Sequence, residues 1–400
     1  MSLFSIAERF TALDHSGLEL NTERCLHSQD RFSGCQACFG ICPVSAITPG
    51  KPPSLDPQKC AKCTACLMVC PVGAYSTDDE VTALLTAAKR LEGGPLELLC
   101  ERNPRPSLGV PKAGTAIRIK GCLAGLGSGA YLALAVLGQE NILVRTDACS
   151  TCMWTTLPGQ VEAQVTNARQ LLEGGGNDSS LECVSGLESP IERPFWEAAN
   201  PPLSRRDIFQ TALHQGRATL ARVVDEWRTT PAERQPGRDR LRMLNALKQL
   251  PAPQPASAGS LKGMDFAWVT VSEACTACGI CARICPTSAL QFGKYAGETA
   301  FQLTFQAAKC VGCDMCVHVC GPAAMNLDHN PTFARIFSQE NVIIRAGALI
   351  KCKKCGVLTV AQPGVDLCPL CDFRRTHPFG SMLPPGLKKI KPPAAQEKPE

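Results

Sequence analysis

Closely spaced cysteines are the residues of this chain whose type and spacing could do chemistry. Three blocks follow the spacing C-x2-C-x2-C-x3-C; they consist of Cys60, Cys63, Cys66 and Cys70, of Cys275, Cys278, Cys281 and Cys285, and of Cys310, Cys313, Cys316 and Cys320. An incomplete block with Cys35, Cys38 and Cys42 precedes them. This spacing is typical of loops that hold four-iron, four-sulfur clusters. Blocks arranged in two pairs therefore predict a protein that moves electrons.

Zinc knuckles are the alternative interpretation of these blocks. A structural zinc site uses separate pairs of ligands, whereas each block here is a run of three cysteines followed by a fourth. Proline follows the last cysteine at Pro43, Pro71 and Pro286, where its fixed φ helps to turn the chain away from the ligand. In the last block Gly321 comes before Pro322, which alters this turn but leaves every cysteine in place. The pattern favours iron–sulfur clusters over zinc.

The paired blocks resemble bacterial-type dicluster ferredoxins, in which each fourth cysteine belongs to the neighbouring cluster. The resemblance implies three cluster sets: Cys275, Cys278, Cys281 and Cys320; Cys310, Cys313, Cys316 and Cys285; and Cys60, Cys63, Cys66 and Cys42. The remaining set has Cys35, Cys38 and Cys70, but Phe32 stands where its first ligand should be. Such a cluster is either a three-iron form, or takes an outside ligand, or is completed by Cys25. We favour Cys25, because a cysteine so close to a cluster loop is otherwise unexplained.

Residues 95–185 carry a separate group, Cys100, Cys122, Cys149 and Cys152. The sequences LELLCER, AIRIKGC and NILVRTDAC predict strands, and GSGAYLALAVLGQ predicts a helix. Alternation of strand and helix indicates a small α/β domain with a parallel sheet. The cysteines follow the strand ends, at the edge where ligands collect in such sheets.

Three interpretations of this middle group remain open: a fifth iron–sulfur cluster with two or four irons, a redox-active dithiol at Cys149 and Cys152, or buried inert thiols. Cys183, further along, is expected to be a plain thiol. The text from Ile119 to Cys152 also resembles the small iron–sulfur subunit that joins a hydrogenase to heterodisulfide reductase. That resemblance implies a cluster here and a place in a larger redox complex.

The last group, Cys352, Cys355, Cys368 and Cys371, forms two C-x2-C turns, and Gly356 permits the tight turn after the second ligand. It resembles a zinc ribbon and the short rubredoxin-like knuckle of rubrerythrins. Four thiolates in tetrahedral geometry suit Zn or a single Fe equally well. The expected cofactors are therefore four [4Fe-4S] clusters, a fifth iron–sulfur cluster, and one Zn or mononuclear Fe.

We expect an α+β multidomain chain with two ferredoxin-like dicluster modules flanking a small α/β domain, plus a C-terminal metal knuckle. The expected parts are the first module at 1–80, the α/β domain at 81–185, a helical and Pro-rich linker at 186–270 with a helix over 207–227, the second module at 271–344, the knuckle at 345–375 and a disordered tail at 376–400.

The formal charge of +5 is offset by the roughly two negative charges that each oxidised cubane adds, so it gives no argument for nucleic acid binding. No basic and apolar leader or membrane-spanning run is apparent, which favours a cytoplasmic protein that reaches a membrane only through a partner. The GLGSG sequence at 125–129 lacks the register of a phosphate-binding loop. His318, inside a cluster loop, either tunes that cluster by a hydrogen bond or is a surface histidine.

The sequence thus predicts an electron-transfer component that passes electrons between donor and acceptor subunits, with no catalytic residue of its own. The alternative is a reductase that acts on a disulfide or sulfur substrate at Cys149 and Cys152. A non-redox scaffold whose knuckle touches nucleic acid is a third hypothesis, which the cluster spacing disfavours.

Overall fold

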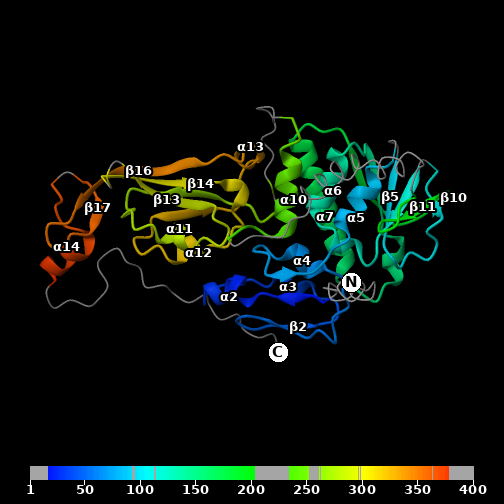
Figure 1. Cartoon of the computed structure of the whole chain (residues 1–400), viewed down its shortest axis with the longest axis horizontal. Helices are drawn as coiled ribbons and strands as arrows, with labels where there is room; N and C mark the ends of the chain where they lie inside the picture. The colour runs from blue at the N-terminus through cyan, green and yellow to red at the C-terminus, as the bar shows by residue number, and fades with distance from the viewer. Residues whose placement is uncertain are drawn as a thin grey trace, which may run out of the picture. The chain divides into compact units, whose positions relative to one another are not determined.

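The computed structural model describes residues 17–91, 95–111, 114–202, 234–251, 261, 263–295, 297, 299–362 and 364–377 (Figure 1). The chain divides into two compact units: unit 1 contains Met1–Cys25 and Gln36–Gly259, and unit 2 contains Leu26–Cys35 and Ser260–Glu400. The helix expected at 207–227 lies outside the described residues, as does nearly all of the tail expected at 376–400. Within the described parts, no helix combines the length and apolar character needed to cross a bilayer.

The first two cysteine blocks lie in a small module of short helices and strand pairs. Its elements are β1 (Glu19–Leu20) paired with β4 (Tyr75–Ser76), β2 (Ile47–Thr48) paired with β3 (Ser54–Leu55), and the neighbouring helices α3 (Ala37–Ile41) and α4 (Ala65–Val69). The β2–β3 hairpin lies between Cys42 and Cys60. Each helix begins inside a cysteine block, so the local fold is organised around the sulfurs.

A parallel five-stranded sheet forms the next part of unit 1, in the order β11-β7-β5-β8-β9. Its strands are β5 (Leu96–Leu99), β7 (Thr115–Arg118), β8 (Asn141–Arg145), β9 (Ser180–Val184) and β11 (Phe195–Glu197). The helices α5 (Val81–Ala88), α6 (Ser128–Val136) and α7 (Leu157–Gly174) lie beside it (Figure 1). Leu98 and Val144 are fully buried, as expected for a parallel sheet covered by helices. The sheet is parallel, helices lie between several of its strands in sequence, and its last strand ends at Glu197.

Helix α10 (Arg238–Leu247) shows that the segment expected as a linker at 186–270 also contains packed structure. The helix lies against α6, and the guanidinium groups of Arg238 and Arg242 both bind the Asp79 carboxylate, at 2.8 and 2.7 Å. Asp239 accepts hydrogen bonds from the backbone N–H groups of Ser128 and Gly129 at the start of α6, at 3.1 and 2.7 Å. A carboxylate of the chain itself therefore fills the anion-binding position at this helix start.

Unit 2 contains the second cysteine pair. Its strands are β12 (Trp268–Val271), β13 (Leu290–Tyr295), β14 (Ala300–Phe305), β15 (Met325–Asp328), β16 (Val342–Lys351) and β17 (Leu358–Val360). Its helices include α11 (Ile280–Ile284), α12 (Met315–His318), α13 (Phe333–Phe337) and α14 (Pro369–Thr376). Strands β13 and β14 form a hairpin, and the phenylalanines Phe301, Phe305 and Phe333 are buried in unit 2. The β12–β15 pair begins at Trp268, slightly before the expected boundary at 271.

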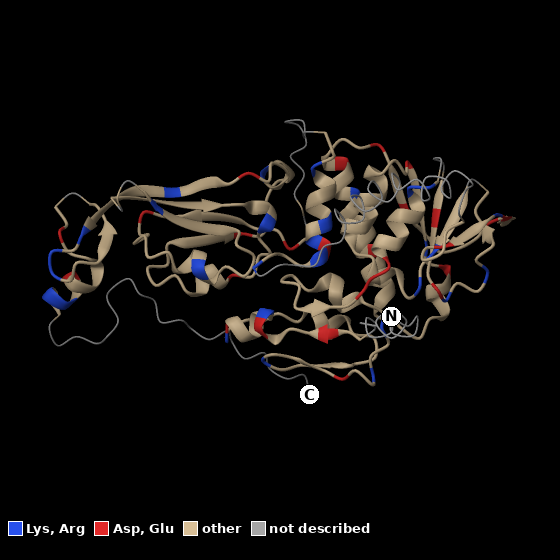
Figure 2. Ribbon diagram, in the orientation of Figure 1, with Lys and Arg blue, Asp and Glu red and all other residues tan. Residues whose placement is uncertain are grey.

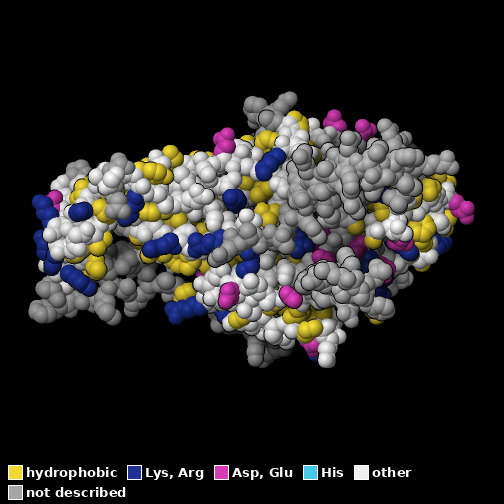
Figure 3. All heavy atoms as spheres, viewed as in Figure 1, with side chains coloured by type: hydrophobic (Ala, Val, Ile, Leu, Met, Phe, Trp, Pro, Cys, Tyr) yellow, Lys and Arg dark blue, Asp and Glu magenta, His cyan; other side chains and the backbone are white. Residues whose placement is uncertain are grey.

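The long strand β16 joins the second module to the knuckle, because it pairs first with β14 and then with β17. Exposed basic residues surround the knuckle; they include Lys353, Lys354, Arg374 and Arg375 (Figure 3). Elsewhere, for instance over the α/β domain, acidic and basic positions are interspersed (Figure 2). Among the residues that the structure describes, no single sign of charge therefore dominates.

Candidate metal centres

The three complete blocks share an unusual backbone at their second cysteine. The residues on either side of Cys63, Cys278 and Cys313 have left-handed φ angles between 52° and 68°. These residues are Lys62 and Thr64, Ala277 and Gly279, and Gly312 and Asp314. Left-handed residues within a loop turn successive N–H groups toward one side, which makes a concave site for an anion. The described residues around Cys38 lack this feature, so the incomplete block also differs in its backbone.

The turn after the last cysteine is repeated in all four blocks. In each block the third residue after the last cysteine has a left-handed φ; these residues are Ser45, Gly73, Ser288 and Ala323. In three blocks the next backbone N–H donates to the cysteine sulfur at 3.2 Å: Ala46 to Cys42, Ala74 to Cys70 and Ala324 to Cys320. Hydrogen bonds to sulfur favour the thiolate form, which is the form that binds metals.

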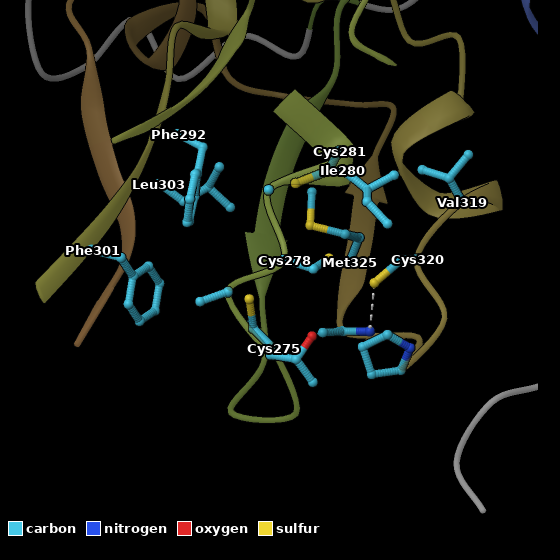
Figure 4. Close-up of a pocket in the computed structure, with 15 residues that line it drawn as sticks. Cys275, Cys278, Ile280, Cys281, Phe292, Phe301, Leu303, Val319, Cys320 and Met325 are labelled. Atoms are coloured by element: carbon cyan, nitrogen blue, oxygen red, sulfur yellow. Dashed lines mark hydrogen bonds between the residues drawn. The ribbon is translucent and has the colours of Figure 1, made fainter. Parts of the chain in front are cut away.

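One pocket in unit 2 is lined by Cys275, Cys278, Cys281 and Cys320 (Figure 4). Apolar side chains that include Phe292, Phe301 and Leu303 line the same pocket. Cys278 is exposed, in contrast to the other three cysteines. Three cysteines from one block and the last cysteine of the other thus line one pocket.

A second pocket in the same unit is lined by Cys310, Cys313, Cys316 and Cys285. In unit 1 a third pocket is lined by Cys42, Cys60, Cys63 and Cys66. Both combine three cysteines of one block with the last cysteine of its neighbour. The structure therefore brings together each of the three complete sets that the sequence indicates.

The incomplete set is only partly assembled within one unit. Cys25 lies close enough to Cys38 to raise the pKa of that thiol, although burial raises it more. Cys70 and Cys38 both neighbour Tyr75, whose pKa they raise after the larger effect of burial. Cys35 is the last residue of the segment that belongs to unit 2. Cys25 is thus positioned near the incomplete set, on the side of Cys38.

The thiols in these pockets suit a cationic cluster core. Burial is the largest cause of the raised pKa of Cys66, followed by its neighbours Cys63, Cys60 and Cys42. Burial and neighbouring thiols likewise raise the pKa of Cys281 and Cys313 to about 12. Four thiolates cannot share an apolar pocket without positive charge between them, and iron ions supply that charge. The donor set therefore fits a four-iron cluster.

The middle group lies at the carboxyl ends of β5, β7 and β8. The chain runs from β5 to β7 on one side and then to β8 on the other, so these strand ends form the switch point where α/β sheets bind ligands. Burial, then Cys100, Cys63 and Cys149, raises the pKa of Cys122 to about 12. Burial raises the pKa of Cys100 and of Cys149 most, and Cys152 raises both further. The four middle cysteines therefore lie close enough to influence one another's pKa.

A buried polar network holds two of the cysteine loops of this group together. Arg145 is fully buried and binds the Asp147 carboxylate through two hydrogen bonds of 2.9 and 3.0 Å. Asn103, three residues after Cys100, donates to the same carboxylate at 3.3 Å. Because Asp147 begins the turn that carries Cys149, one side chain positions both loops. Sequence reasoning missed Arg145, Asn103 and Asp147, since their partners become apparent only in three dimensions.

The loop of the first module packs directly against the turn that follows Cys122. A Cβ atom on Gly125 would lie 2.7 Å from the Cys63 carbonyl oxygen and would also meet the Thr64 hydroxyl. Only glycine therefore allows this close approach. The middle group and the Cys42–Cys66 pocket are neighbours within unit 1.

The knuckle has the geometry of a site for one ion. The sulfurs of Cys352, Cys355, Cys368 and Cys371 all lie within 4.8 Å of one another. The Cys355 and Cys368 sulfurs are 3.7 Å apart, close to the ~3.8 Å edge of a tetrahedron with 2.3 Å metal–sulfur bonds. Backbone hydrogen bonds, mainly that of Cys368, lower the pKa of Cys352 to about 6. The donor set fits Zn²⁺ or a single iron ion.

His318 does not stand alone on the surface. Its Nδ1 atom lies 2.7 Å from Oδ2 of Asp30, a buried carboxylate in the segment Leu26–Cys35 of unit 2. The His318 imidazole therefore has a carboxylate partner. Neither alternative considered from the sequence foresaw this pair.

Comparison with known families identifies two segments. A model described as a 4Fe-4S dicluster domain matches residues 274–324, and one described as a 4Fe-4S binding domain matches residues 53–76. The first match contains both blocks of unit 2, and the second contains Cys60 to Cys70 but not the incomplete block. Searches of curated proteins and of solved structures gave no match. The chain therefore contains two 4Fe-4S ferredoxin-type domains.

Proposed function

We propose that this chain is a multi-cluster electron-transfer protein, similar to a polyferredoxin, that serves as the electron-wiring subunit of a larger redox complex. The observation that carries the proposal is the set of three apolar pockets, each lined by four cysteines from two paired blocks. When bound, a four-iron cluster accepts or releases one electron at a time. The residues of the chain hold the clusters, exclude water and donate N–H groups to sulfur, which tunes cluster potentials.

Four [4Fe-4S] clusters are proposed, one for each set of the two modules. The incomplete set would use Cys35, Cys38, Cys70 and Cys25. The effect of Cys25 on the pKa of Cys38 supports this choice. Phe32, at the position of the missing ligand, offers no donor atom.

A fifth iron–sulfur cluster is proposed at Cys100, Cys122, Cys149 and Cys152. The mutual proximity of these thiols and their place at the strand ends support it. A redox-active dithiol requires a thiol that ionises easily. Burial instead raises the pKa of Cys149 to about 11, so the reductase alternative is not favoured. The knuckle would hold one Zn or one iron ion.

Redox proteins are the proposed partners, as electron donor and acceptor, in the cytoplasm. Cys278 is exposed, whereas the other cysteines of the ferredoxin-type blocks are at least half-buried. Of the two ferredoxin-type pockets in unit 2, the one that Cys278 lines is therefore the more accessible to a partner. No role for nucleic acid is proposed.

Metal analysis of the anaerobically purified chain tests the proposal. The four clusters of the two modules require about 16 iron and 16 sulfide per chain, and the fifth cluster adds about two to four iron atoms. Cys149→Ser should lose only the iron of the fifth cluster, about two to four atoms. Cys183→Ser, in the same sheet, should lose none, because Cys183 lies outside the proposed ligand sets. Equal metal content in the two variants would refute the fifth cluster, and zinc in place of iron would refute the whole proposal.

A further inference from the structure

The four turns that end the cysteine blocks form an internal repeat that isolates one residue. Each turn continues with Ala and then a residue that begins or enters a strand. That last residue is Ile47, Tyr75, Leu290 or Met325. Three of these side chains are apolar, whereas Tyr75 carries a hydroxyl group. Tyr75 follows the turn after Cys70, and Cys70 is a proposed ligand of the incomplete set.

Tyr75 places its hydroxyl in a buried position. The residue is 2% exposed, and its oxygen atom has no hydrogen-bond partner among the residues that the structure describes. Tyr75 follows Ala74, whose N–H donates to the Cys70 sulfur at 3.2 Å. Burial raises the pKa of Tyr75 most, and the Cys38 thiol raises it further through a direct side-chain interaction, followed by Cys66 and Cys70. The hydroxyl thus lies beside Cys38 of the incomplete set, and Cys66 of the neighbouring set is also close.

A second buried tyrosine shows the usual way in which such a hydroxyl is satisfied. Tyr131 is fully buried, and its hydroxyl donates to the Leu123 carbonyl oxygen at 3.2 Å. An unpaired buried hydroxyl is costly, so a phenol kept at this position calls for an acceptor. Phenylalanine would fill the same volume without that cost.

We infer that the Tyr75 hydroxyl donates a hydrogen bond to sulfur of the cluster held by Cys38 and Cys70, and that it raises the reduction potential of this cluster. A hydrogen bond to sulfur stabilises the reduced cluster more than the oxidised one, because the reduced cluster carries more negative charge. Tyr75 is therefore a tuning residue, and it distinguishes this cluster from those beside Ile47, Leu290 and Met325. The inference rests on the proposed function, since it requires a cluster at this set.

Tyr75→Phe tests the inference in the full anaerobic chain. Redox titration followed by low-temperature electron paramagnetic resonance (EPR) should show one cluster shifted to lower potential, with iron and sulfide content unchanged. Two controls remove a hydroxyl elsewhere: Tyr131→Phe, whose hydroxyl has a protein acceptor, and Tyr295→Phe, which is 51% exposed. Neither control should shift the potential of the cluster that Tyr75→Phe affects.

A second measurement uses the unaltered chain, so it remains decisive if Tyr75→Phe fails to retain its cluster. Electron–nuclear double resonance of the reduced protein after exchange into D2O should detect an exchangeable proton coupled to this cluster, which Tyr75→Phe lacks. Unchanged potentials in Tyr75→Phe, or no such proton in the unaltered chain, would overturn the inference while the clusters remain. Absence of iron from the unaltered chain would instead overturn the proposed function.

Discussion

Replacing Glu97 with Gln should destabilise the α/β domain far more than the same replacement at Glu197. Glu97 lies on the central strand β5 with its side chain fully buried. Its Oε2 atom accepts a hydrogen bond from Nη1 of Arg145 at 2.7 Å and is also bound by Arg193. The Arg145 and Arg193 side chains are 0% and 2% exposed. One carboxylate therefore binds two buried guanidinium groups.

The cost follows from the charges that remain after the change. Glu97→Gln leaves Arg145 with the Asp147 carboxylate, and leaves Arg193 with backbone carbonyl groups such as that of Pro106. Breaking a buried ion pair from one side costs about 3–5 kcal/mol. This is a large part of the roughly 5–15 kcal/mol that stabilises a typical domain.

Glu197 provides the matched control, because it lies in the same sheet and pairs with Arg118. Their side chains are 44% and 28% exposed. A solvent-exposed pair contributes only about 0–1 kcal/mol. Glu197→Gln should therefore change the stability of the domain very little.

Hydrogen exchange measured by mass spectrometry can report both variants in the anaerobic chain. Peptides that span β5 and β8 should exchange roughly 100- to 4,000-fold faster in Glu97→Gln, since each 1.4 kcal/mol is a factor of ten. Peptides from β13 and β14 of unit 2 serve as the internal reference. If the two variants gave the same exchange rates in β5, the reasoning from the buried network would be wrong.

Three further predictions concern single side chains. Burial raises the pKa of Asp239 to about 6, so the stability it contributes is present below about pH 4 and is lost as pH rises through 6. Chemical denaturation should show unit 1 weakening by up to about 3 kcal/mol over this window, and Asp239→Asn should remove most of that dependence. If stability depended on pH equally in Asp239→Asn and in the unaltered chain, this prediction would be wrong. Cys355→Ser should remove one metal ion per chain and no sulfide; loss of sulfide would show that the knuckle holds a cluster. Cys25→Ser should lower the iron content by about one to four atoms and change the EPR spectrum of one cluster, whereas an identical spectrum would exclude Cys25 as a ligand.

Cysteine spacing predicted much of the candidate site because the ligands of each cluster are local in sequence apart from one exchanged residue. The grouping of Cys275, Cys278 and Cys281 follows from their loop alone. The addition of Cys320 came from the resemblance to dicluster ferredoxins, and the pocket agrees with it. The placement of Cys100, Cys122 and Cys149 at strand ends was also foreseeable, because buried apolar strands are easily recognised.

Features that depend on distant partners were not foreseeable. Helix α10 lies in a segment that was expected to be a linker. Its packing involves the pairing of Arg242 with Asp79, and these two residues are far apart in sequence. The short strand β11 adds Phe195–Glu197 to the sheet through parallel pairing with β7, which no local pattern reveals. The burial of the Tyr75 hydroxyl likewise depends on how α3, α4 and β4 pack together.

The central claim is tested most directly by low-temperature EPR of the anaerobically purified chain after dithionite reduction. Sulfur-bound iron that exchanges single electrons predicts a brown protein whose reduced form gives a paramagnetic iron–sulfur signal. A colourless protein that stays silent after reduction would contradict the account.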